Sequence, residues 1–265
     1  MSGRAIVTGA SGAFGTAVRA ELNRRGWSVV GLDLEQKGDE ILACDVTDDH
    51  AVSRGVAAAA QRLGGIDALV NNAGIGGPAS AGAPPDEYVR RMLDVNLLGA
   101  WRVTAAAIDH LVESRGRVVL LGSRMSFIGL PLGAAYGVSK RALTAYADAL
   151  RAEYGTHVDV TCIHPAFVRT PIHDRTREAG LQLEGFSTEE PIEQVVAKIV
   201  RACEGRNPGR DVAVTRGGAL QMGVARHLPR LVDRVVARTL AKRINAGDLD
   251  GADVAAGLRA RHRGR

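Results

Sequence analysis

Short apolar runs recur along the chain, and most are followed by a longer segment with apolar residues at helical spacing. The runs occupy residues 5–7, 28–32, 40–46, 66–70, 117–122, 158–163 and 211–215. Near-continuous apolar runs of this length are typical of strands buried on both faces. Strands that alternate with helices imply right-handed crossovers between parallel strands. We therefore predict an α/β fold, in which a doubly wound, mostly parallel sheet lies between two layers of helices.

The intervening segments predict helices over residues 51–63, 192–204 and 136–153, and a long helix, with or without a break, over residues 86–114. Thr47 is a suitable N-cap for the first of these helices. The chain has 265 residues, of which 46% are hydrophobic, so it can bury a sizeable core. We find no internal repeat beyond the strand–helix rhythm, and we expect residues 1–265 to form a single domain.

Composition excludes several classes of protein. The net charge is only +5, and four arginines of that excess lie in the last seven residues, RARHRGR. A solvated tail explains this better than a nucleic-acid surface. Cys44, Cys162 and Cys203 are far apart and show no metal-ligand spacing, so we expect no metal and a reducing compartment. No signal peptide and no apolar run of membrane-spanning length is visible, and we expect a cytoplasmic protein.

A glycine-rich turn joins the first predicted strand to the first helix. The sequence Thr8-Gly9-Ala10-Ser11-Gly12-Ala13-Phe14-Gly15 places backbone N–H groups and a helix N-terminus where a pyrophosphate can bind, as in Rossmann-type folds. The second strand ends at Asp33, and a carboxylate there binds ribose hydroxyls and repels a 2′-phosphate. Leu34 follows in place of an arginine that would attract that phosphate. The sequence therefore predicts NAD in preference to NADP.

Tyr136 and Lys140 are four residues apart, which places both side chains on one face of a helix. An ammonium group beside a phenol favours the phenolate, so we expect the pKa of Tyr136 to fall toward the working pH. Ser123 follows the run 117–122, at the carboxyl end of a strand where open α/β sheets bind ligands. A YxxxK pair on its own is weak, because many helices carry one by chance.

Taken together, Ser123, Tyr136, Lys140 and the glycine turn resemble the short-chain dehydrogenase/reductase family, in its short single-domain branch. The resemblance runs from Ala5 to about Pro171. It implies adenine contacts from Asp45 and Val46, and ribose contacts near Asn71-Asn72-Ala73-Gly74. It also implies that Asn96 holds a water and that Val168 and Thr170 bind the nicotinamide amide. The implied cofactor-binding set is Gly9, Ser11, Phe14, Gly15, Asp33, Asp45, Val46, Asn72, Ala73, Gly74, Tyr136, Lys140, Val168 and Thr170.

The family's reaction would be hydride transfer between NAD(H) and a secondary alcohol or ketone. Tyr136 would act as the base, Lys140 would stabilise the phenolate and bind ribose, Ser123 would hold the substrate oxygen, and Asn96 would complete a proton path. Ala13 and Ala166 replace glycines of the family pattern and argue mildly for a dinucleotide sensor or scaffold without turnover. The intact set of Asn96, Ser123, Tyr136 and Lys140 argues against that alternative. A sugar-nucleotide epimerase is a further alternative, although such enzymes usually need a longer C-terminal domain.

The substrate side is less constrained by the sequence. Residues 124–132 carry side chains suited to an apolar pocket, and ordinary loop packing explains them equally well: Arg124, Met125, Phe127, Leu130 and Leu132. We interpret residues 171–191 as a substrate lid. His164 precedes a proline and is interpreted as structural.

The last part of the chain is expected to hold a basic amphipathic helix over residues 226–244 and a loosely held tail over residues 245–265. The helix can cover the cleft, pack on another subunit or lie on an anionic membrane, and we favour packing over membrane contact. In the family, the helices at 97–114 and 136–153 form subunit interfaces, which implies a homodimer or homotetramer.

Overall fold

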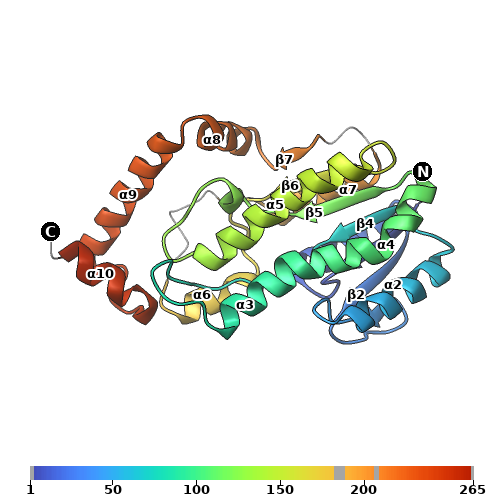
Figure 1. The fold of residues 1–265 in the computed structure, drawn as a ribbon, viewed down its shortest axis with the longest axis horizontal. Coiled ribbons are helices and arrows are strands. Elements are labelled where there is room, and N and C mark those ends of the chain that lie inside the picture. Colours follow the sequence, from blue (N-terminus) through green and yellow to red (C-terminus); the bar gives the residue numbers. More distant parts are fainter. Residues whose placement is uncertain (1–2, 182–188, 206–208, 264–265) are drawn as a thin grey trace.

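A computed structural model of the chain describes residues 3–181, 189–205 and 209–263. Within them, parallel strands form one sheet in the order β3-β2-β1-β4-β5-β6-β7 (Figure 1). The chain builds outward from β1 to β3 and then returns to the other side of β1, so a crevice opens where β1 and β4 diverge at their carboxyl ends. The strands are β1 (Arg4–Thr8), β2 (Ser28–Asp33), β3 (Ile41–Ala43), β4 (Ala68–Asn71), β5 (Arg117–Leu121), β6 (Asp159–His164) and β7 (Asp211–Ala213).

Helices cover both faces of this sheet, which confirms the predicted three-layer architecture. On one face α1 (Ala13–Arg24) packs beside α7 (Ile192–Cys203), and on the other lie α2 (Asp49–Leu63), α4 (Ala100–Ser114) and α5 (Ala134–Tyr154). Successive residues of β1 point to opposite faces. Ile6 therefore packs in the cluster with α2 and α4, whereas Ala5 and Val7 pack with α1 and α7.

The expected long helix at 86–114 contains a change of winding. It consists of α3 (Glu87–Leu93), the π-helical segment η1 (Asp94–Gly99) and α4. The buried side chain of Asn96 lies in η1, where its amide hydrogen-bonds Ile75 and Ser139. One wider turn is the usual way for a helix to turn such a side chain toward a site.

Two local predictions were wrong. The N-cap of α2 is Asp48, whose carboxylate accepts a hydrogen bond from the N–H of Ala51, whereas the Thr47 hydroxyl donates to Asp45. A carboxylate accepts the helix amide at least as well as a hydroxyl and also complements the helix dipole. The third strand is shorter than residues 40–46 and covers only Ile41–Ala43.

Residues 216–263, which we call the C-terminal arm, differ from the prediction. The expected helix at 226–244 is divided between α8 (Arg216–His227) and α9 (Pro229–Asn245). Leu228 leaves the helical conformation because a residue before proline is disfavoured there, and Pro229 then begins α9. The arm extends to one side of the sheet (Figure 1).

The expected loosely held tail is also folded over the described part of the chain. Residues beyond α9 form η4 (Asp253–Ala255) and α10 (Ala256–Arg263). Leu249, Ala252 and Ala255 are buried against Leu240 and Ile244 of α9, so this end of the chain has a small core of its own. The sequence analysis missed it because three apolar residues in a polar stretch give no clear periodicity.

The predicted lid at 171–191 is described only in part. It begins with η3 (Pro171–His173) and α6 (Asp174–Glu178), and residues 182–188 lie outside the described residues. No helix in the described ranges is long and apolar enough to cross a bilayer.

Candidate active site

Two connected hollows lie at the carboxyl ends of the strands. The first hollow is bordered by the β1–α1 turn and by the ends of β2, β3 and β4. The second hollow is bordered by the segments that follow β5 and β6 and by the start of α5. Both are lined by a shared group of residues at their junction: Phe14, Asn72, Gly74, Thr170 and Ile172.

The glycine turn fits closely under β4. Gly9 has φ +61°, and a Cβ there would lie 2.9 Å from the Cα of Ala73. A Cβ on Gly15 would lie 2.2 Å from the carbonyl oxygen of Gly9. Such close approach requires glycine at both positions. Ala13 is the first residue of α1 and borders the first hollow, so its methyl group is accommodated in the fold.

Asp33 is held rigidly at the end of β2. One carboxylate oxygen accepts the N–H of Ser11 at 2.7 Å, and the other accepts the N–H of Leu34 at 2.8 Å. The carboxylate thus lies between the glycine turn and the β2 end, on the border of the first hollow.

Side chains at the β1 and β4 ends hold the two strands together. The Asn72 amide donates to the carbonyls of Thr8 and Gly9 at 2.9 and 3.0 Å. The Thr8 hydroxyl accepts the N–H groups of Asn72 and Ala73. Asn72 and Thr8 therefore fix the ends of the neighbouring strands β1 and β4 relative to each other.

Asp45 and Val46, which follow β3, also line the first hollow. One carboxylate oxygen of Asp45 accepts both the N–H and the hydroxyl of Thr47, so it fixes the turn into α2. Most of the residues predicted to bind the dinucleotide thus line this hollow: Gly9, Phe14, Asp33, Asp45, Val46, Asn72, Ala73, Gly74 and Thr170.

Ser123, Tyr136 and Lys140 meet on the wall of the second hollow. Ser123 follows β5, and its hydroxyl is hydrogen-bonded to that of Tyr136 in the first turn of α5. Lys140 lies one turn further along α5; its ammonium donates to the Leu121 carbonyl at 2.7 Å and lies 5.7 Å from the centroid of the Tyr136 ring.

The expected lowering of the pKa of Tyr136 is wrong for the polypeptide by itself. Burial raises the pKa of Tyr136 to about 12, and the hydrogen bond to Ser123 only opposes that rise. Burial also lowers the pKa of Lys140 to about 8, against an opposing contribution from Cys162. Loss of hydration therefore governs the pKa of Tyr136, since burial disfavours the charged phenolate.

Asn96 ties the β4 end to α5. Its amide oxygen accepts the N–H of Ile75 at 2.8 Å, and its amide nitrogen donates to the Ile75 carbonyl and to the Ser139 hydroxyl, each at 3.0 Å. A Cβ on Gly74 would lie within 3.5 Å of both the Asn96 amide oxygen and the Lys140 ammonium. Asn96 thus lies beside the lysine, and its predicted water-holding role stays a prediction.

The segment after β6 completes the junction. Val168 and Thr170 line the second hollow, and the Thr170 hydroxyl donates to the Val168 carbonyl at 3.3 Å. The N–H of Ala166 donates to the buried carboxylate of Glu190 at 2.8 Å, so the alanine at this family glycine position is also accommodated.

Comparison with known proteins decides the family. A family model described as short chain dehydrogenase matches residues 4–180. The chain belongs to the short chain dehydrogenase family.

Named relatives of the chain are oxidoreductases. It is 30% identical over 247 residues to an L-fucose dehydrogenase of Bos taurus. The matched region covers 82% of this chain and 90% of the relative. It is 36% identical over 184 residues to an uncharacterized oxidoreductase of Myxococcus xanthus, which covers 63% of this chain and 73% of the relative. As a member of this family, the chain is an oxidoreductase.

Solved structures show the same fold at lower identity. Ligand-free aldohexose dehydrogenase of Thermoplasma acidophilum is 24% identical with a TM-score of 0.74, over 83% of this chain and 94% of that one. A short chain dehydrogenase of Burkholderia cenocepacia, in complex with NADP, is 21% identical with a TM-score of 0.75, over 89% and 97% of the two chains. Another neighbour, from Brucella melitensis, is complexed with NADH.

The residues of this family member fit a nicotinamide dinucleotide. The tight turn that Gly9 and Gly15 permit places the N-terminus of α1 on the border of the first hollow, where backbone N–H groups attract phosphate. The Asp33 carboxylate lies at the strand end where the fold receives a ribose.

The substrate side of the second hollow is only partly as predicted. Arg124, Met125 and Leu130 line it, and Leu132 lines a third, apolar hollow that continues from it past Tyr136. Phe127 lies elsewhere, with its ring edge against His164. For this residue the alternative of ordinary packing holds, because the chain turns away in η2 (Arg124–Ser126).

Three lining residues from the C-terminal arm were missed by the sequence analysis. Gln221 of α8 borders the second hollow and accepts a hydrogen bond from Arg124, and Leu240 of α9 and Leu249 border the third. The arm lies beyond the end of the resemblance, where no motif indicated a contact with the site.

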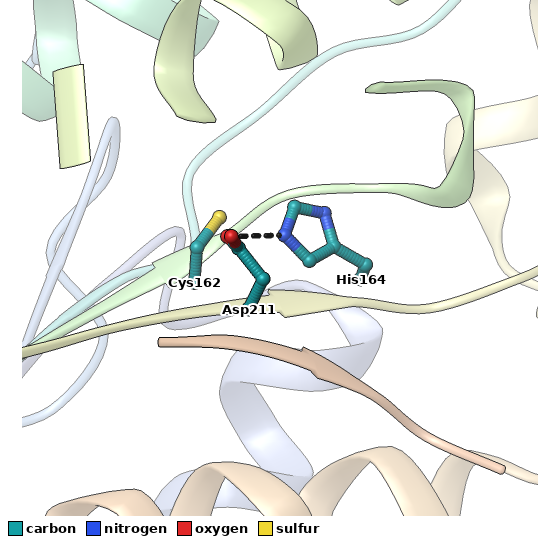
Figure 2. A group of neighbouring side chains, drawn as sticks. All are labelled: Cys162, His164 and Asp211. Atoms are coloured by element: carbon teal, nitrogen blue, oxygen red, sulfur yellow. Dashed lines mark hydrogen bonds and ion pairs between the residues drawn. The ribbon is translucent and has the colours of Figure 1, made fainter. Parts of the chain in front are cut away.

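Behind Ser123 lies a buried cluster of Cys162, His164 and Asp211 (Figure 2). Nε2 of His164 is 3.2 Å from an Asp211 carboxylate oxygen, and Nδ1 is 3.2 Å from the Ser123 carbonyl oxygen. Both partners are acceptors, so only the doubly protonated ring donates to both. Burial alone lowers the pKa of His164, but the contacts with Asp211 and Cys162 raise it to about 9.

This cluster joins β6 to β7 and fixes the peptide of Ser123. Cys162 and His164 are two residues apart on β6 and so point to the same face, but the partner on β7 could not be read from that spacing. Both ring nitrogens of His164 have hydrogen-bond partners. Hydrogen bonding therefore explains why the three side chains of the cluster lie together. His164 lines neither the first nor the second hollow among the described residues.

Proposed function

We propose that this enzyme transfers a hydride between NAD(H) and a secondary alcohol or ketone. The observation that carries the proposal is the meeting of Ser123, Tyr136 and Lys140 on the wall of the second hollow, which shares part of its lining with the first. A substrate oxygen in the second hollow would then lie within reach of the hydroxyl groups of Ser123 and Tyr136. A nicotinamide at the junction would face the substrate carbon that carries this oxygen.

The first hollow would hold the dinucleotide. The glycine turn and the α1 N-terminus would bind the pyrophosphate, Asp33 the adenosine ribose, and Asp45 and Val46 the adenine. Val168 and Thr170 would orient the nicotinamide at the junction. The bound cofactor supplies or accepts the hydride, and the chain's own residues bind, orient and move the proton.

Tyr136 would exchange a proton with the substrate oxygen. A phenol with a pKa of about 12 remains protonated near neutral pH and is ready to donate to a ketone oxygen as charge develops on it. In the oxidative direction the phenolate is needed, and the Lys140 ammonium would stabilise it. Ser123 would donate to the same oxygen and hold it beside the phenol. Asn96, bonded to the loop beside Lys140, would position the path to solvent.

Asp33 supports NAD in preference to NADP. Its two oxygens are fixed by the backbone of Ser11 and Leu34, so the carboxylate would remain beside the 2′ position and repel a phosphate there. The structural neighbours include an NADP complex and an NADH complex. This preference therefore rests on Asp33 of this chain.

The lining of the hollows supports an apolar substrate with one polar end. Met125, Leu130, Leu132 and Leu240 surround the space beyond Tyr136, and Arg124 and Gln221 supply the polar groups. Named relatives range from L-fucose dehydrogenase to retinol dehydrogenase, so their names do not narrow the choice.

A fluorescence titration with NADH, followed by a panel of ketones and alcohols of graded polarity, tests the proposal. We expect NADH to bind more tightly than NADPH and apolar ketones to be reduced faster than sugars. NADH binding without turnover on the panel would favour the alternative of a dinucleotide sensor or scaffold. Turnover only with sugars would contradict the apolar substrate but leave the chemistry in place.

We further propose a homodimer or homotetramer formed through α4 and α5. Trp101 is 52% exposed and Val138 is 58% exposed on these helices, as is usual for surfaces covered by another subunit. Sedimentation equilibrium should give a multiple of the chain mass, and Trp101→Glu should lower it. The three unpaired, buried cysteines support a reducing, cytosolic location.

A further inference from the structure

The outward face of α9 carries an exposed row of apolar side chains. Leu228 is 54% exposed, Leu231 is 47% exposed and Val235 is 53% exposed. Leu231 and Val235 are four residues apart, so they lie on one side of the helix, and Leu228 immediately precedes its first residue. Leu220 of α8, in the same arm, is 70% exposed.

The opposite side of α9 already has its packing partners. Leu240 and Ile244 are buried in the core of the arm with Leu132, Leu249 and Ala252. The exposed row is therefore separate from the surface that holds the arm in place.

A row of arginines runs beside the apolar row. Arg230, Arg234 and Arg238 are four residues apart and exposed, and no ion pair is found for them in the described part of the chain. Residues 216–265 carry 11 lysines and arginines against 4 aspartates and glutamates, a net charge of +7, whereas the whole chain has only +5. The arm thus holds more than the entire positive excess of the protein.

We propose that the outward face of α9 docks on a membrane surface that contains anionic lipids. The arginine row would contact the headgroups while Leu228, Leu231 and Val235 enter the interfacial region. A second copy of the chain on this face would bring two strongly positive arms together, which is unfavourable. A nucleic acid would use the arginines but not the apolar row.

The sequence alone favoured packing of this helix against the chain or another subunit over contact with a membrane. In the structure, the residues of α9 that pack in the buried core lie on its inner side. That inner side also reaches the site, because Leu240 lines the third hollow beside Tyr136. A docked arm would therefore lie between the lipid surface and the hollow proposed for an apolar substrate. Docking itself is independent of the proposed function, since it is measured without cofactor or turnover.

Co-sedimentation of the full-length chain with lipid vesicles tests the proposal. The probes are vesicles of phosphatidylcholine alone and vesicles with about 30% phosphatidylserine, because anionic lipid should supply much of the attraction. At about 0.1 M salt we expect the chain to bind the vesicles with phosphatidylserine and not those of phosphatidylcholine alone. At about 0.5 M salt this binding should weaken markedly, because charges are screened.

Two sets of variants separate the charged row from the apolar row. Replacing Arg230, Arg234 and Arg238 with Gln should weaken binding about a hundredfold. Leu231→Gln together with Val235→Gln leaves the charge unchanged and should weaken binding about tenfold. The matched control replaces Arg54, Arg90 and Arg201, which are exposed on other faces, with Gln and should bind like the unmodified protein.

Four outcomes would overturn the proposal. One is failure to bind the anionic vesicles, and another is equal weakening by the control variant. The third is binding of a short DNA duplex at the same salt without vesicle binding, which would assign the arginines to nucleic acid. Sedimentation of the Leu231 and Val235 variant is measured in parallel, and a loss of subunits there would assign the face to a second copy. Thermal melting shows that each variant is folded.

Discussion

The first hollow and the second hollow are built in different ways. At the strand ends the first is bounded by backbone groups and small residues, such as Gly9, Gly12 and Ala73, and a Cβ on Gly9 would lie only 2.9 Å from the Cα of Ala73. The second is lined by long side chains from loops and from the C-terminal arm, such as Met125, Leu130 and Gln221. Backbone geometry tolerates little change, whereas side chains are exchanged without altering the fold. The cofactor end should thus be rigid and the substrate end adaptable.

The largest effect is expected where the two ends meet. Lys140→Ala should lower kcat/KM about a thousandfold and also weaken NADH binding, because the ammonium would serve both the phenolate and the ribose. Steady-state kinetics and a fluorescence titration measure the two effects. Loss of turnover with unchanged NADH affinity would place Lys140 in the substrate end alone.

The cluster of Cys162, His164 and Asp211 behind Ser123 should contribute to the free energy of unfolding. Within the site it should affect the substrate end alone. His164 has its pKa raised to about 9 from 6.5, so its stabilising contribution is complete below pH 6.5 and is lost as the pH rises toward 9. The loss is about 3 kcal/mol. Urea unfolding at both pH values should show this difference in the unmodified protein and not in His164→Gln. An equal pH effect in both proteins would contradict the doubly protonated ring.

A methyl group in the glycine turn should damage only the cofactor end. The Cβ of Gly15→Ala would lie 2.2 Å from the Gly9 carbonyl, so the turn must shift, at a cost of about 2 kcal/mol and with weaker NADH binding. Gly12→Ala is the matched control, since its Cβ would lie 3.3 Å from the same oxygen. Equal NADH affinities for the two variants would show that the tight contact is unimportant.

The smallest effect concerns the choice of cofactor. Asp33→Ser with Leu34→Arg removes the carboxylate and supplies a cation, so the ratio of NADPH to NADH efficiency should rise at least about tenfold. The KM for the ketone should stay constant, because neither residue lines the second hollow. An unchanged cofactor ratio would mean that Asp33 serves only to hold the turn.

The sequence analysis was accurate where short-range pattern and backbone geometry decide the structure. The strands, the glycine turn and the spacing of Tyr136 and Lys140 each depend on a few neighbouring residues, and the structure brings them to one cleft. It failed where long-range contacts decide. Asp211 reaches His164 from another strand, and Gln221 and Leu240 reach the hollows from the arm. The predicted direction of the pKa shift of Tyr136 was also wrong, because the burial of a side chain cannot be read from residue spacing.

The kinetics of Tyr136→Phe test the central claim most directly. The substitution removes one oxygen from the wall of the second hollow and leaves the first hollow untouched. We expect NADH affinity within about twofold of the unmodified protein and ketone reduction at least about a hundredfold slower in single-turnover measurements. Hydride transfer at an unchanged rate would contradict a proton exchanged at the phenol and, with it, the chemistry proposed for this cleft.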